Sequence, residues 1–207
     1  MKQKTEQELK QNYDKFIAII KKYFTGERLE KLLHMYSETE LGGNLIVSPA
    51  SGNLNYHNAY TGGYIDHIFN VCKNALKMKK TFEEAGGVCD FTEEELIFVA
   101  LHHDLGKLGT KAELHYAPND SEWHIKNQGK MYEFNEDLTS MTIGERSVYY
   151  MISNNQCDGW LTDIEYQAIL NYDKGQGDKM AEWHTSSLGE ILKMAIKLAI
   201  MEEKTKA

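Results

Sequence analysis

The feature that most constrains this chain is the segment ALHHDLGKLG, residues 100–109, in which an apolar helix ends in two histidines and an aspartate. A buried charge is costly unless it is paired or bound to a metal. Adjacent His103 and Asp104 can ligate one ion together, through a ring nitrogen and a carboxylate oxygen. They need a further ligand, which His67 in GGYIDHIFNV, near the start of the preceding long helix, can supply. The sequence therefore predicts a metal site formed by these three residues.

Each half of this pattern also has a plain structural explanation. A single histidine such as His67 is often satisfied inside a core, and HHDLGK on its own could be a fortuitous helix terminus. Single motifs of this kind carry little weight. The two segments together favour the metal site over both alternatives.

Helix start signals and apolar periodicity predict a mostly helical chain. Thr92-x-x-Glu95 forms a capping box, and the same pattern begins at Thr142, Thr162 and Ser187. Each of these precedes a stretch with helical apolar spacing. We expect helices at residues 3–24, 27–38, 63–85, 92–106, 144–155, 162–172 and 187–204.

Two long segments, residues 39–62 and 108–140, lack helical periodicity and are expected to be irregular. Within the second, WHIKNQGKMYEF (residues 123–134) alternates aromatic and polar residues and predicts a small hairpin that turns at Asn127-Gln128-Gly129. Long loops often carry function. Helix 3–24 is amphipathic, so it can pack on the domain or on another subunit of an oligomer.

The formal net charge of −8 and the isoelectric point near 5.5 limit the partners. They disfavour tight binding to duplex nucleic acid, which rests on Lys and Arg contacts to phosphates. They allow a small nucleotide, because a metal can supply positive charge locally. Three widely spaced cysteines without a CxxC pattern are typical of reduced thiols. The polar N-terminus lacks a signal-peptide core, and no apolar run approaches the ~20 residues of a membrane span. We expect a cytoplasmic protein.

At these residues the chain resembles the HD superfamily of metal-dependent phosphohydrolases. The likeness rests on GGYIDHIF followed by LHHDLGK, and on SPASGNLNYHNAYTGG (residues 48–63), which is similar to the lead-in of several HD hydrolases, including bacterial 3′→5′ exoribonucleases. Downstream, APNDSEWHIKNQGKMYEFN, ERSVYYMI and LTDIEYQAIL resemble HD proteins of tailed bacteriophages. The resemblance covers residues 41–200. It implies an all-α HD-domain helical bundle with a small irregular or hairpin insertion, with N-terminal helices at 1–40 and the HD domain at 41–207.

The resemblance also implies roles for individual residues. His67, His103 and Asp104 match the first three metal ligands of the family, and Asp104 would take part in catalysis. Lys107 matches the lysine of the family's HDLGK motif and could meet a substrate phosphate; a solvated helix-end lysine is the alternative. His57 matches the histidine of the lead-in and could bind substrate, or it could bond to the backbone of its own loop.

Three further residues keep alternatives open. Arg146 could bind a substrate phosphate or form an ordinary salt bridge. His102 is expected to pack in the core or support the ligands, because adjacent helical positions point ~100° apart. Glu190 could replace a missing ligand, although a capping box already explains it.

The sequence departs from the family pattern at its last ligand. The family has an aspartate on the final long helix, usually in an H-x-AD context, whereas this chain has Ile196, with Lys193 in place of the histidine. Two histidines found in two-metal relatives are replaced by Ile143 and Tyr172. Asp173, beside Tyr172, is the nearest replacement ligand. A two-metal clamp needs more ligands than these, so the sequence favours one divalent ion, either Mn, Fe, Ni, Co, Zn or Mg.

The first function that we expect is a one-metal phosphohydrolase acting on a nucleotide or short oligonucleotide phosphoester. The ion would lower the pKa of a water molecule that attacks phosphorus, and Lys107, Arg146 or His57 would neutralise the phosphate. The alternative is a degenerate HD module that binds a nucleotide or a host protein without turnover, such as a phage protein that antagonises a host defence. Oxidative chemistry at an HD-like site is the remaining class.

Overall fold

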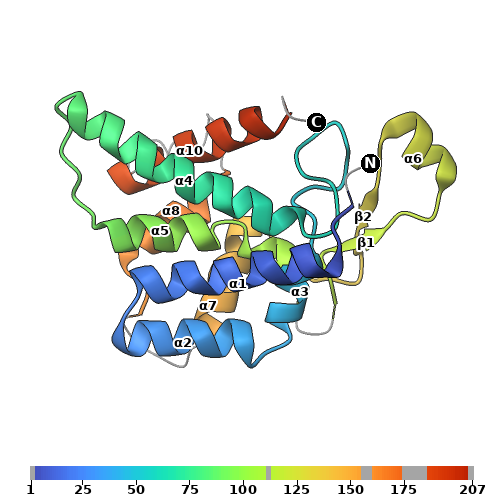
Figure 1. The fold of residues 1–207 in the computed structure, drawn as a ribbon, viewed down its shortest axis with the longest axis horizontal. Coiled ribbons are helices and arrows are strands. Elements are labelled where there is room, and N and C mark those ends of the chain that lie inside the picture. The colour runs from blue at the N-terminus through green and yellow to red at the C-terminus, as the bar shows by residue number, and fades with distance from the viewer. Residues whose placement is uncertain (1–2, 111–112, 155–159, 174–185, 205–207) are drawn as a thin grey trace. The chain divides into compact units, whose positions relative to one another are not determined.

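A computed structural model describes residues 3–110, 113–154, 160–173 and 186–204 of the chain. Within these ranges helices dominate and β1 pairs only with β2, which confirms the predicted all-α class. None of the described helices is both long and apolar enough to cross a membrane. The elements, labelled in Figure 1, are α1 (Glu6–Tyr23), α2 (Gly26–Ser37), α3 (Leu41–Val47), α4 (Gly63–Glu84), α5 (Glu93–His102), the 3-10 helix η1 (Leu105–Leu108), β1 (Tyr116–Pro118), α6 (Glu122–Gln128), β2 (Tyr132–Phe134), α7 (Ile143–Asn154), α8 (Asp163–Asn171) and α10 (Ser187–Lys204).

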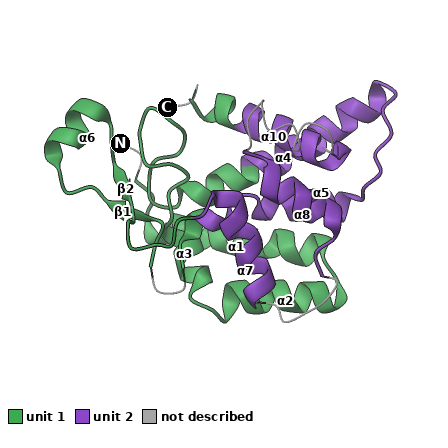
Figure 2. Cartoon of the chain, turned by 180° about the vertical axis from the view of Figure 1, so that it is seen from behind, with its two compact units in different colours: residues 1–69, 107–140, 200–207 green, residues 70–106, 141–199 purple. Residues whose placement is uncertain are grey.

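The chain divides into two compact units, coloured separately in Figure 2. Unit 1 comprises residues 1–69, 107–140 and 200–207, and unit 2 comprises residues 70–106 and 141–199. The division falls inside α4 and inside α10, so each of these helices contributes residues to both units. The division at residue 40 that the sequence suggested is a different one and stays a prediction.

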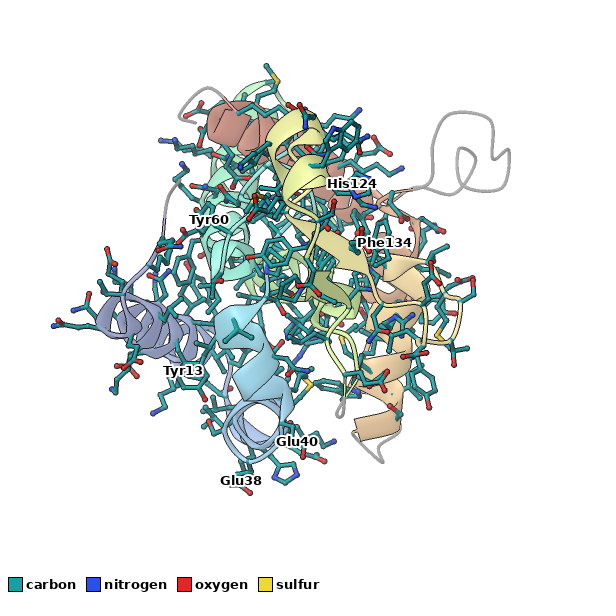
Figure 3. The ribbon with its side chains drawn as sticks, turned by 90° about the vertical axis from the view of Figure 1, so that its right-hand side faces the viewer. Tyr13, Glu38, Glu40, Tyr60, His124 and Phe134 are labelled. Atoms are coloured by element: carbon teal, nitrogen blue, oxygen red, sulfur yellow. The ribbon has the colours of Figure 1, made fainter. Side chains whose placement is uncertain are left out.

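In unit 1, α1, α2 and α3 pack together around aromatic residues. Phe16 and Tyr36 are buried and meet edge to face, with ring centroids 4.8 Å apart. The Tyr13 hydroxyl (Figure 3) donates to the backbone oxygen of Tyr36 at 2.8 Å. A capping box at Thr5 and Glu8 starts α1. The core of this unit therefore begins with the amphipathic N-terminal helix.

The hairpin predicted for residues 123–134 is wrong in its detail. Residues 122–128 form α6, while β2 pairs antiparallel with β1, so α6 lies within the connection of a two-stranded sheet. Figure 3 labels His124 of this helix and Phe134 of β2. Ser121 caps the helix by accepting from the backbone N–H of His124, and Gly129 ends it in the left-handed conformation, with φ at 65°. The Ser121 cap and the Gly129 stop signal favour a short helix here, although the alternation of aromatic and polar residues favours a strand.

In unit 2, α5 and α7 each contact α8. Helix α5 has an acidic first turn, and all of its residues from Leu96 to His102 are buried. The capping boxes predicted at Thr92, Thr142 and Thr162 are confirmed. The one predicted at Ser187 is wrong.

Ser186, one residue earlier, caps α10 by accepting from the backbone N–H of Gly189 at 3.1 Å. The Ser187 hydroxyl instead donates to Asp90. Glu190 is exposed and pairs with Lys193 at 3.2 Å. A surface ion pair therefore accounts for this glutamate, and not a capping box.

Candidate metal centre

Asp66 anchors the first turn of α4, and His67 follows directly after it. The carboxylate of Asp66 accepts hydrogen bonds from Lys4 Nζ at 2.6 Å, Tyr60 Oη at 2.7 Å and Asn12 Nδ2 at 2.8 Å. Burial alone would raise the pKa of Asp66, but the hydrogen bonds from Lys4 and Tyr60 and the charge of Lys4 lower it below its usual value. These contacts, all inside unit 1, fix where α4 begins.

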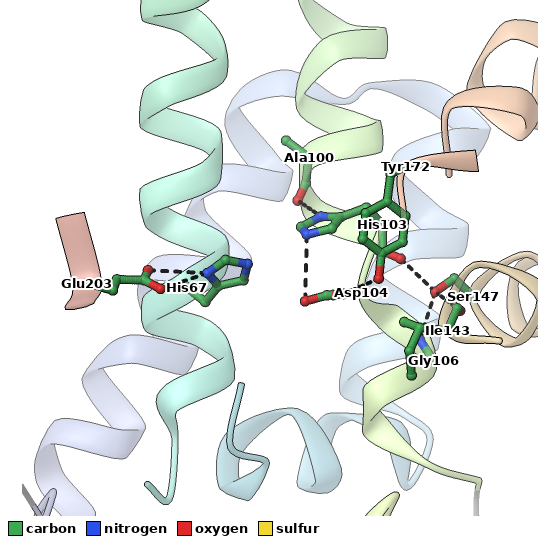
Figure 4. A network of polar contacts seen from close by, with 9 residues as sticks. All are labelled: His67, Ala100, His103, Asp104, Gly106, Ile143, Ser147, Tyr172 and Glu203. Carbon is green, nitrogen blue, oxygen red and sulfur yellow. Dashed lines mark hydrogen bonds and ion pairs between the residues drawn. The ribbon is translucent and has the colours of Figure 1, made fainter. Parts of the chain in front are cut away.

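His67 is 1% exposed and is held by a carboxylate from the last helix. Its Nδ1 lies 2.9 Å from Oε2 and 3.3 Å from Oε1 of Glu203 on α10 (Figure 4). Glu203 is itself buried. When Nδ1 of a neutral imidazole donates to such a carboxylate, the lone pair sits on Nε2. This hydrogen bond therefore makes Nε2 of His67 the nitrogen that suits a metal.

His57 stacks on His67 within unit 1. The centroids of the two rings lie 4.6 Å apart. The loop that carries His57 is tied down by Ser51, whose hydroxyl donates to the His57 backbone oxygen at 2.7 Å. One donor atom from each of His57, His67 and Glu203 lies within 4.8 Å of the others, so this group could hold a metal ion.

In unit 2, α5 ends at His102 and the chain turns through His103 and Asp104. His103 is fully buried, and its Nδ1 bonds to the backbone oxygen of Ala100 at 3.0 Å, so Nε2 carries the lone pair of the neutral ring. Asp104 Oδ2 lies 3.7 Å from this Nε2. That separation exceeds a hydrogen bond, and it suits two donor atoms that share one ion.

The second oxygen of Asp104 is bound by Tyr172, at the C-terminal end of α8. The Tyr172 hydroxyl donates to Oδ1 at 2.5 Å, and its ring meets the ring of His103 edge to face at a centroid distance of 5.0 Å (Figure 4). Tyr172 therefore touches both members of the His-Asp pair. It leaves Oδ2 as the carboxylate oxygen that faces His103.

The turn after Asp104 is clamped against α7. Ser147 is fully buried, and its Oγ accepts from the backbone N–H of Gly106 at 2.8 Å. The same hydroxyl can donate to the backbone oxygen of His103 at 2.9 Å or of Ile143 at 2.8 Å. A Cβ at Gly106 would lie 2.5 Å from the Ile143 oxygen, so only glycine allows this close approach. The turn and α7 thus fix the backbone of the ligand pair.

The other residues singled out in the sequence occupy varied places. Lys107 is half-buried on η1, and Arg146 on α7 is 5% exposed, with its Cβ beside Gly106. His102 is fully buried, bonds to the Phe98 backbone oxygen and stacks on the Phe98 ring, which is the packing role expected for it. Asp173 is exposed, whereas its neighbour Tyr172 makes the contact to Asp104.

Two residues of the site were not identified as contributors from the sequence. Glu203 lies seven positions after Ile196 on α10, and positions seven apart fall on nearly the same helix face. That spacing was the available signal. The role of Tyr172 could not be found from the sequence, because its hydrogen bond to Asp104 depends on tertiary packing.

The donor chemistry of these groups fits a divalent ion. Imidazole nitrogen together with carboxylate oxygen suits the ions from Mn to Zn. The histidine Nδ1 atoms bond to a carboxylate or a backbone carbonyl, which is the usual support of a metal-bound histidine. Buried histidine and acidic side chains that could hold a metal ion are thus present.

Comparison with known proteins gives one informative match. No family model matches the chain, and no solved structure matches it. The chain is similar to a dihydroneopterin 2′,3′-cyclic phosphate phosphodiesterase of Methanocaldococcus jannaschii, with 41% identity over 61 residues. That stretch is 30% of this chain and 24% of the relative. The chain therefore shares a segment with a phosphodiesterase and spans about a quarter of that protein's length.

Proposed function

We propose that the protein is a metal-dependent phosphohydrolase of the HD type. One divalent ion would be held by Nε2 of His67, Nε2 of His103 and Oδ2 of Asp104, a group of side chains able to hold a metal. The observation that carries the proposal is the orientation of the two imidazoles. Both histidines are buried, and each has Nδ1 in a hydrogen bond that leaves the lone pair on Nε2.

The chemistry divides between the ion and the chain. A divalent ion in such a site polarises a phosphoryl oxygen and lowers the pKa of water. Asp104 orients its Oδ2 for the ion through the bond from Tyr172. We assign Lys107, three residues after Asp104, to neutralise charge on the substrate phosphate. His57, which stacks on His67, would contact the substrate. Arg146 is 5% exposed, and its part in substrate binding stays a prediction.

The substrate class that we favour is a phosphodiester of a nucleotide or of a short oligonucleotide. The relative is named for a 2′,3′-cyclic phosphate diester, which is the same functional group that 2′,3′-cyclic nucleotides carry. The net charge of −8 disfavours a long nucleic acid duplex. A small substrate whose phosphate meets the ion is compatible with that charge.

A second candidate is a protein that binds a nucleotide or a host protein without turnover. Ile196 favours it, because a buried isoleucine stands where relatives carry the last acidic ligand. The resemblance to phage HD proteins is the reason to consider a host protein as the partner, and that partner stays a prediction.

Hydrolysis assays separate the two candidates. Purified protein would be loaded with Mn²⁺, Co²⁺ or Zn²⁺ and given bis(p-nitrophenyl) phosphate and 2′,3′-cyclic nucleotides, beside His103→Ala and Lys107→Ala variants. We expect metal-dependent hydrolysis that His103→Ala abolishes and that Lys107→Ala weakens without loss of metal. Tight binding of a cyclic nucleotide with no product under any metal would support the second candidate.

A further inference from the structure

The last long helix contributes an acid to the site at a position that differs from the family pattern. Helix α10 has Ile196 in place of the expected ligand, yet Glu203, two turns later, contacts His67. We propose that Glu203 is the positioning residue of the metal centre. In this proposal its carboxylate holds the His67 ring so that Nε2 points to the ion. The inference rests on the proposed metal site and adds a residue to it.

The geometry supports positioning over a chance surface contact. Both carboxylate oxygens of Glu203 lie near the same nitrogen, Nδ1 of His67, at 2.9 and 3.3 Å. The two side chains are 1% and 3% exposed, so solvent does not screen the interaction. A carboxylate at Nδ1 fixes the ring tautomer and its orientation, and makes Nε2 a more basic ligand.

The spacing of Ile196 and Glu203 along α10 shows how this helix can present an acid to the site without an aspartate at position 196. Seven residues turn an ideal helix through ~700°, about 20° short of two full turns. Glu203 thus lies on nearly the same face of the helix as Ile196, about two turns further on.

Metal binding tests this assignment with three variants. Mn²⁺ and Co²⁺ affinity would be measured calorimetrically for the intact chain and for Glu203→Gln, Glu203→Asp and Glu202→Gln, the last being a matched control one residue away. We expect Glu203→Gln to bind one ion roughly 10–100-fold more weakly, as loss of such a support usually does. We expect Glu203→Asp to lose less and Glu202→Gln to match the wild type. The Co²⁺ absorption spectrum should change in Glu203→Gln, while urea unfolding of the metal-free variants stays close to wild type.

Three other results of the metal titrations would overturn the proposal, and each identifies which part of it is wrong. Wild-type affinity in Glu203→Gln, with binding still lost in His103→Ala, overturns the positioning role and leaves the metal site intact. Two ions in the wild type and one in Glu203→Gln would make Glu203 a ligand of a second ion together with His57, and would also overturn it. A wild-type chain that binds no ion overturns the metal site itself, and the role of Glu203 with it.

Discussion

The hydroxyl of Tyr172 donates a hydrogen bond of 2.5 Å to Oδ1 of Asp104, across 68 positions of sequence. The two oxygens of the Asp104 carboxylate therefore have different neighbours. Oδ1 is held by the phenol, while Oδ2 faces Nε2 of His103 at 3.7 Å. Tyr172 thus orients a carboxylate that we propose as a metal ligand.

Replacing Tyr172 with phenylalanine should weaken metal binding by roughly tenfold, because the bond that orients Asp104 is lost. Calorimetric titration with Mn²⁺ would measure the change. Tyr166→Phe on the exposed side of α8 serves as the control and should bind like the wild type. Unchanged affinity in Tyr172→Phe would mean that the phenol does not support the ligand.

Ser147→Ala should destabilise the fold by about 1–3 kcal/mol, because it leaves the buried backbone N–H of Gly106 without its acceptor. Urea unfolding monitored by circular dichroism would measure this cost. Ser153→Ala lies on the same helix at an exposed position and should change the unfolding free energy little. Equal effects from the two serines would contradict the clamp.

Gly106→Ala should cost about 1–3 kcal/mol, since a Cβ would lie 2.5 Å from the backbone oxygen of Ile143 and α7 would have to move. Gly43→Ala is the matched comparison, because nothing lies within 4 Å of its added Cβ. A helical glycine of that kind should gain about 0.5–1 kcal/mol on substitution by alanine. Thermal unfolding of both variants would measure the two changes in melting temperature. A melting temperature of Gly106→Ala equal to that of the wild type would contradict the close approach of Gly106 to α7.

Asp66 should make the protein sensitive to acid. Its pKa is lowered in the folded state, so its stabilisation is complete above the unfolded value of about 3.9 and is lost as the pH falls through the folded pKa. Between pH 6 and pH 3, the unfolding free energy of the wild type should therefore fall more than that of Asp66→Asn. Asp14→Asn, at an exposed ion pair with Lys10, should follow the wild-type slope. Parallel slopes for all three proteins would contradict this role.

Much of the helical fold could be predicted because its signals are local. The predicted spans 63–85 and 187–204 match α4 and α10 closely. Helix α5, by contrast, ends at His102, whereas the predicted helix continued to residue 106. Beyond His102 the chain turns and continues as the 3-10 helix η1, and the backbone N–H of Gly106 bonds to Ser147 on α7. The local sequence does not show that tertiary contact.

The candidate site divides in the same way. His67, His103 and Asp104 could be singled out from residue type and motif, and each is buried. Glu203 and Tyr172 were not assigned, because their roles arise from contacts 136 and 68 positions distant in sequence. For Glu203, the helical spacing from Ile196 was a signal that the motif reading did not use. A short helix such as α6 was also missed, since seven residues give too little periodicity to outweigh aromatic alternation.

The measurement that tests the central claim most directly is elemental analysis of protein purified without chelator, beside His67→Ala, His103→Ala and Asp104→Ala. We predict about one transition-metal ion per wild-type chain, or one after loading with Mn²⁺, and its loss in all three variants. A wild-type chain that holds no ion even after loading, or variants that keep theirs, would contradict a metal centre at these residues.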